Sequence, residues 1–195
     1  MAVWNLIKGK WGNPRTSVAP IRTDASTHSL QTVTYEHHEI HGGSHFFAEH
    51  GFDLSAADYM DVIITTPDTT KWSHITYELE CEDETLWMIY EGGTVLTAGT
   101  TVTAINNNRN SSKTAGTTVT YVQGENEATT ATYTSTASAT RLALGTVASF
   151  KAGGNTTRDH EIVLKQNETY VFRAIATSAG WVSFNAEWYE HTDKD

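Results

Sequence analysis

Short alternating runs of apolar and polar residues, divided by turn residues, make up the chain from Ser29 onward. Every second residue from Ile75 to Cys81 is apolar and the residues between them are polar, which is the period of a strand that buries one face. The same period recurs in several other segments. It predicts strands over residues 31–41, 58–66, 73–81, 85–91, 100–106, 117–123, 130–138, 161–165, 170–177 and 182–188.

Composition supports this all-β interpretation. The chain has 195 residues, of which 32 are Thr, a residue type that favours strands over helices. Turn pairs such as Gly42-Gly43, Pro67-Asp68 and Gly92-Gly93 divide the runs, and only residues 55–59 predict a helical turn. About ten short strands without an amphipathic helix predict a single all-β domain, a jelly roll or β-sandwich.

The first 27 residues differ in charge and pattern from the rest. They hold four cations and one carboxylate, a net charge of +3, so with a total of −10 the remaining residues carry −13. No period of 2 or 3.6 is sustained there, and we expect an extended N-terminal arm over 1–27 and a sandwich body over 28–195. Tryptophans beside cations are typical of interface anchors. The arm is predicted either to dock on a partner or to fold over its own body through Trp4, Lys8, Lys10, Trp11, Arg15 and Arg22.

Five of the nine histidines lie between positions 37 and 50. On a strand, His37, Glu39 and His41 would share one face, and imidazole and carboxylate groups are ligands for zinc or a similar ion. Neither the metalloprotease pattern nor the two-His, one-Glu spacing of metal-binding double-stranded barrels is present. We therefore expect surface and turn residues here, with no metal and no cofactor. A metal-dependent jelly-roll enzyme that uses this cluster is the weaker alternative.

Other patterns for catalysis or ligand binding are weak or missing. Residues 78–84 hold five carboxylates, which could serve glycoside hydrolysis, but they fall on an exposed strand face and the following turn, so we expect a solvated hairpin end. No nucleophile elbow, phosphate loop or dinucleotide glycine pattern occurs, and no enzyme is predicted. Trp87, Trp181 and Trp188 could stack on a sugar, although core or interface packing explains each more simply.

Charge, cysteine content and hydropathy restrict the partners and the compartment. The acidic balance argues against nucleic-acid binding, which needs a basic surface. No stretch approaches the roughly 20 apolar residues that cross a bilayer, and no secretory signal is visible, so we expect no membrane partner and synthesis in a cytoplasm. Cys81 is the only cysteine, which excludes an internal disulfide, and its position on the apolar side of 73–81 predicts a buried thiol.

Six short strings resemble a group of small proteins encoded beside the major capsid protein in tailed bacteriophages. They are residues 40–47 (IHGGSHFF), 65–72 (TTPDTTKW), 90–92 (YEG), 106–111 (NNNRNS), 164–167 (LKQN) and 187–191 (EWYEH). The resemblance runs from about residue 28 to the end of the chain, and residues 125–160 match least.

This resemblance implies a head decoration, or cement, protein with a jelly-roll body. Such a protein binds the major capsid protein on the outer surface of the virion, commonly as a trimer at three-fold positions, after synthesis in the host cytoplasm. Its role would be structural, clamping adjacent capsid subunits against internal DNA pressure. A carbohydrate-binding or host-adhesion module on a virion is the alternative. The resemblance implies no set of contact residues, so the arm carries the predicted docking residues.

Overall fold

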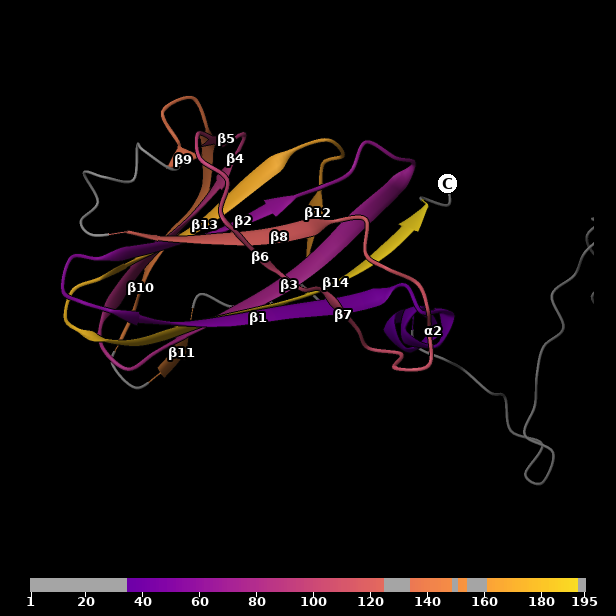
Figure 1. Ribbon diagram of the computed structural model, residues 1–195, viewed down its shortest axis with the longest axis horizontal. Helices are drawn as coiled ribbons and strands as arrows, with labels where there is room; N and C mark the ends of the chain where they lie inside the picture. The colour runs from indigo at the N-terminus through magenta and orange to yellow at the C-terminus, as the bar shows by residue number, and fades with distance from the viewer. Residues whose placement is uncertain (1–34, 125–133, 149–150, 154–160, 193–195) are drawn as a thin grey trace, which may run out of the picture. The chain divides into compact units, whose positions relative to one another are not determined.

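The computed structural model describes residues 35–124, 134–148, 151–153 and 161–192 (Figure 1). Tyr35 begins a compact unit that contains all of them. The predicted arm over 1–27, its six docking residues and its boundary with the body lie outside the described residues. The described residues therefore all belong to the predicted body.

The described residues form one helix and fourteen strands. In chain order the elements are α2 (Tyr35–Gly42), β1 (His45–Leu54), β2 (Tyr59–Thr65), β3 (Lys71–Cys81), β4 (Thr85–Glu91), β5 (Thr94–Val95), β6 (Thr100–Val102), β7 (Ile105–Asn106), β8 (Thr118–Gly124), β9 (Thr134–Ser135), β10 (Thr140–Val147), β11 (Lys151–Gly153), β12 (Ile162–Leu164), β13 (Thr169–Ala176) and β14 (Gly180–Thr192).

These strands form two antiparallel sheets and a short ribbon. The first sheet has the order β11-β3-β14-β1-β7, and β12 also pairs with β3. The second sheet has the order β10-β4-β13-β2-β8-β6, and β5 pairs with β9 in the ribbon. Buried side chains from both sheets form one apolar cluster, so the two sheets pack face to face as a β-sandwich (Figure 1).

The connections are those of a jelly roll. Going inward from both ends of the chain, β1 pairs with β14, β2 with β13, β3 with β12 and β11, and β4 with β10. Successive pairs alternate between the two sheets, as when a long hairpin is wound around a barrel. The insertion between β4 and β10 supplies β5 to β9 and adds edge strands to both sheets. The predicted all-β jelly-roll sandwich is confirmed.

The core follows the predicted alternation. Ile75, Tyr77, Leu79 and Cys81 of β3 are all buried, and burial raises the pKa of the Cys81 thiol. From the other sheet, the Phe172 ring contacts Tyr77, with 5.2 Å between ring centroids. Every second residue of β3 therefore faces the second sheet.

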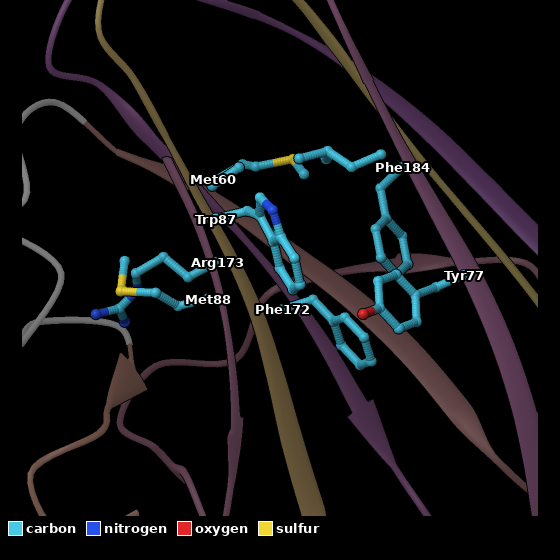
Figure 2. Close-up of a pocket in the computed structure, with 9 residues that line it drawn as sticks. Met60, Tyr77, Trp87, Met88, Phe172, Arg173 and Phe184 are labelled. Carbon is cyan, nitrogen blue, oxygen red and sulfur yellow. The ribbon is translucent and has the colours of Figure 1, made fainter. Parts of the chain in front are cut away.

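A small cavity lies in the core between the two sheets. It measures about 10 Å³. Figure 2 shows the rings of Tyr77 and Phe184 from the first sheet gathered with those of Trp87 and Phe172 from the second, and Arg173 apart from them. A cavity of this size holds at most one water molecule, and its walls are mostly apolar. We interpret it as a packing gap between the sheets rather than a ligand site.

The strand predicted over 31–41 is wrong in its described part, where α2 forms instead. Gly43 has a φ of +70°, its N–H donates to the Ile40 carbonyl, and the Ser44 N–H donates to the Glu39 carbonyl. These two bonds are the Schellman arrangement that ends a helix at a glycine. The Gly42-Gly43 pair is thus a helix stop, and the chain then enters β1, a strand that the sequence pattern does not predict because His50 interrupts its apolar alternation.

Three further predictions change in detail. The strand predicted over 100–106 is two short strands, β6 and β7, which belong to different sheets. The helical turn predicted over 55–59 is a tight turn in which Ala57 has a φ of 68°. Within the strand predicted over 130–138, residues 130–133 lie outside the described residues, and β9 covers only Thr134–Ser135.

Candidate functional site

One end of the sandwich concentrates the polar networks of the body. We call it the α2 end: α2, the loop 66–70, the loop 107–117, the turn 165–168 and residues 187–192 of β14. The strand register brings these segments together, because His45 pairs with Tyr189, Lys71 with Thr192, and Thr65 with Thr169. Figure 1 shows α2 next to the beginning of β1.

A buried carboxylate fixes the loop 107–117 at this end. Glu190 is 4% exposed. Its Oε1 atom accepts hydrogen bonds from the backbone N–H of Thr117 at 2.8 Å, from that of Gly116 at 3.0 Å and from Nε1 of Trp188 at 3.1 Å. The Glu190 side chain therefore connects β14 and the Trp188 indole to the end of the loop 107–117.

His45 is fully buried at the same end. Its Nδ1 atom lies 2.6 Å from Nδ2 of Asn107, and its carbonyl accepts the Asn107 N–H at 2.9 Å. Its ring stacks on Tyr189, with 6.4 Å between centroids. The expectation of a surface or turn position is wrong for this histidine, since β1 begins here and the loop 107–117 contacts it.

The structure separates the three weak metal candidates. His37 and His41 are exposed and their Nε2 atoms are 3.0 Å apart, because residues four apart lie on one face of a helix. Glu39 is buried and does not share that face, so the premise of a common strand face is wrong. Among the described residues, no group of three or more His, Cys, Asp or Glu side chains has metal-holding geometry.

A second imidazole pair has no counterpart among the sequence predictions. His74 on β3 and His191 on β14 have their Nε2 atoms 2.8 Å apart, and Nδ1 of His74 lies 2.7 Å from Oε1 of Glu161. The hydroxyl of Tyr189 donates to the same Glu161 oxygen at 2.6 Å. The two histidines are 117 positions apart, and no local pattern in the sequence reports the register that joins them.

The turn between β12 and β13 is locked to the loop after β2. The Thr66 hydroxyl donates to the Lys165 carbonyl at 2.7 Å and accepts the Glu168 N–H at 2.9 Å. Beside it, Tyr170 donates to Oε2 of Glu91 at 2.9 Å, and burial, together with Glu91, raises the pKa of the Tyr170 hydroxyl. The hydrogen bond from Lys165 is the main cause of a lowered Glu91 pKa.

Replacing Glu91 with Gln is expected to remove an acid-sensitive part of the stability. Because the folded pKa of Glu91 lies below its unfolded value of about 4.5, its ion pair stabilises the protein fully above that value. The contribution is lost as the pH falls through the lower, folded pKa. The difference in unfolding free energy between wild type and Glu91→Gln should be small, because Lys165 is exposed, and constant above about pH 5.5.

Urea unfolding between pH 3 and 7 measures this difference. Glu49→Gln is the matched control, because Glu49 is an exposed carboxylate on β1. A Glu91→Gln difference that grows, rather than shrinks, toward acid would contradict the assignment.

Of the remaining predicted candidates, only Trp188 belongs to the α2 end, where its indole donates to Glu190. Of the three tryptophans, Trp188 is buried, Trp87 is half-buried and Trp181 is 51% exposed. The acidic residues of 78–84 lie at the end of β3 and in its connection to β4, where Glu80, Glu82 and Glu84 are exposed as predicted. The predicted hairpin is wrong, because β3 and β4 belong to different sheets and the connection crosses between them.

Comparison with known proteins finds no matching family model, no matching curated protein and no matching solved structure. The helix within the described residues has neither the length nor the apolar character needed to cross a bilayer.

Proposed function

We propose that this protein is a structural component of a virion, a decoration protein that binds the outer surface of a tailed-phage capsid and stabilises the shell. The major capsid protein is the proposed partner. The body would assemble as a trimer, and the arm over 1–27 would reach the shell or a neighbouring copy. The protein would carry no catalytic site and would act through contact area alone.

The observation that carries this proposal is where the phage-like strings meet. The six strings come from segments spread between positions 40 and 191, yet five of them overlap the α2 end and Glu91 of the sixth bonds to Lys165 there. Hydrogen bonds link them directly: Asn107 bonds to His45, Thr66 to Lys165, and the Glu190 N–H to the Ser44 carbonyl. Strings that meet at one end of the sandwich fit a docking function for that end, whose loops Glu190 and His45 hold in place from within.

Exposed apolar side chains support assembly into an oligomer. β10 is an edge strand of the second sheet, and its Leu142 and Leu144 are exposed, as are Val95 and Leu96 in the insertion. Edge strands with apolar surface readily pair with another chain. We assign this edge to contact with a neighbouring copy, which closed symmetry would bury in a trimer.

Charge supports a docking role for the arm. Residues 1–27 carry +3 and the rest of the chain −13, so the arm is attracted to an acidic surface on its own body, on a neighbouring copy or on the shell. Weak contacts repeated over a capsid add through multivalency. An arm with two tryptophans supplies the anchors that such contacts need.

Deleting residues 1–27 is expected to abolish capsid binding and leave the body folded. Heads lacking the protein, prepared from the phage that encodes it, are mixed with the full chain or the truncated chain and sedimented. Light scattering of the full chain should give about three times the 21.5 kDa of one chain. Equal binding by both chains would remove the arm from the proposal, and no binding by the full chain would remove the decoration function.

Trp181 favours one second candidate, a carbohydrate-binding or host-adhesion module. Its half-exposed ring lies over Gly51, where an added Cβ would collide with the indole. A flat aromatic ring on a sheet surface can stack on a sugar. A glycan array separates the two functions, since the decoration proposal expects no saccharide to bind and Trp181→Ala to leave capsid binding unchanged.

A further inference from the structure

The facing imidazoles of His74 and His191 hold the most unusual arrangement of donors and acceptors in the described residues. They lie on neighbouring strands of the first sheet, where Trp72 pairs with His191 and Tyr189 with His74. Their Nε2 atoms are 2.8 Å apart and their ring centroids 4.6 Å apart. The nature of this contact depends on which of the two nitrogens carry hydrogen.

The partners of the two Nδ1 atoms assign the tautomers. Nδ1 of His74 faces Oε1 of Glu161 at 2.7 Å and the Tyr189 hydroxyl at 3.1 Å. The Tyr189 hydroxyl donates its hydrogen to Glu161, so both oxygens can only accept from His74. Nδ1 of His191 lies 2.9 Å from the Thr192 carbonyl, which is also only an acceptor. Both Nδ1 atoms therefore carry hydrogen.

With these tautomers, two lone pairs converge. In neutral imidazole, hydrogen on Nδ1 leaves Nε2 as an acceptor, so the two Nε2 lone pairs face each other at 2.8 Å. Two acceptors at this distance repel unless both bind one cation, either a proton on the line between the nitrogens or a metal ion to one side of that line. A carboxylate that accepts from the opposite ring nitrogen, as Glu161 does for His74, is the usual support of a metal-ligating histidine.

We propose that His74 and His191 form a binding site for a divalent transition-metal ion of tetragonal preference, Cu²⁺ or Ni²⁺. With metal–nitrogen distances of about 2.0–2.1 Å, a nitrogen separation of 2.8 Å gives an angle at the metal of roughly 85–90°. That angle fits adjacent positions of a square-planar or octahedral ion. A tetrahedral zinc site would need the nitrogens about 3.3–3.4 Å apart.

The surroundings would stabilise such an ion and leave room for solvent. Glu161 supplies a negative charge behind His74, and its side chain is 20% exposed. Tyr189 is buried and stacks on both His74 and His45, which holds the first ring in place. No third protein ligand converges among the described residues, so these supply two nitrogen ligands. A bound ion would join β3, β14 and the residue before β12, and this site does not depend on the proposed function.

The exposed pair on α2 would compete in any binding experiment. His37 and His41 have their Nε2 atoms 3.0 Å apart, and such a pair also binds Cu²⁺ and Ni²⁺. The test therefore uses the full chain, without an affinity tag, carrying His37→Gln and His41→Gln. His38→Gln in the same background is the control, because His38 is exposed and lies on α2.

In that background, calorimetry with CuCl₂ or NiCl₂ alone at pH 7.5 should show one ion per chain. The electron paramagnetic resonance spectrum of the copper form should show two imidazole nitrogens. His74→Gln and His191→Gln should each weaken binding at least tenfold, Glu161→Gln about tenfold, and His38→Gln not at all. His191 lies near the end of β14, so His191→Gln remains informative if His74→Gln does not fold.

Two results would overturn the proposal. Binding of equal strength in the His74→Gln and His191→Gln variants would mean that the metal sits elsewhere. No binding of either metal, together with ¹⁵N spectra in which the two Nε2 atoms share one hydrogen near neutral pH, would mean that the cation between them is a proton.

Discussion

Replacing Arg173 with Met is expected to destabilise the protein by about 3–5 kcal/mol, because it leaves a buried carboxylate without its main partner. Nε of Arg173 donates to Oδ1 of Asp61 at 2.7 Å and Nη2 donates to Oδ2 at 2.9 Å. Their side chains are 6% and 0% exposed. The guanidinium also lies over the ring of Tyr90, 5.8 Å from its centroid. The pair joins β13 to β2 in the middle of the second sheet.

Urea unfolding of two further variants shows whether the charge or the packing matters. Arg141→Met removes an exposed arginine from β10 of the same sheet and should change the unfolding free energy by less than about 0.5 kcal/mol. The double variant Asp61→Leu with Arg173→Met removes both charges and should regain most of the loss. A cost below about 1 kcal/mol for Arg173→Met, or a double variant less stable than the single one, would contradict a dominant role for the buried charge.

The alternation in the sequence predicted the strands that bury one face. It failed where a glycine ends a helix and where a histidine takes an inward position of a strand. β3 from Ile75 to Cys81 and β14 from Val182 to Trp188 keep the period of two, so both were predicted. The segment from His37 to His50 was predicted wrongly because Gly43 ends a helix instead of turning between strands, and because a half-buried His50 occupies an inward position of β1, where it stacks on Tyr121. Burial lowers the pKa of His50.

Less of the candidate site was predictable, because its contacts depend on register between distant strands. No short-range pattern in the sequence relates His74 to His191, or Asn107 to His45. One signal was available: residues 182, 184, 186 and 188 share the inward face, and extending that period by two positions puts Glu190 on it. A carboxylate at a strand position that faces the apolar core needs hydrogen-bond donors. Glu190 at such a position would have indicated a polar network at the end of β14.

Replacing Glu190 with Ala is expected to cost about 3 kcal/mol or more and to release the end of the loop 107–117. Three donors would lose their acceptor: the N–H groups of Gly116 and Thr117 and the indole of Trp188. Hydrogen bonds to a charged group contribute about 1.5–3 kcal/mol each, and buried donors left unpaired add a desolvation penalty. Glu190→Gln keeps the shape and one acceptor oxygen, so it should cost less.

Amide hydrogen exchange locates this effect and urea unfolding measures its size. In Glu190→Ala the exchange rates of the Gly116 and Thr117 amides should rise by more than the fall in global stability accounts for. Local opening of the loop would no longer have to break the hydrogen bonds to Glu190. Glu187→Gln, three residues earlier on β14 and on the outer face, should leave both amides unchanged. Since string 106–111 overlaps this loop, the decoration proposal also expects Glu190→Ala to weaken capsid binding by the full chain. Unchanged exchange at Gly116 and Thr117 would show that the strand pairing of β8, and not Glu190, fixes the loop.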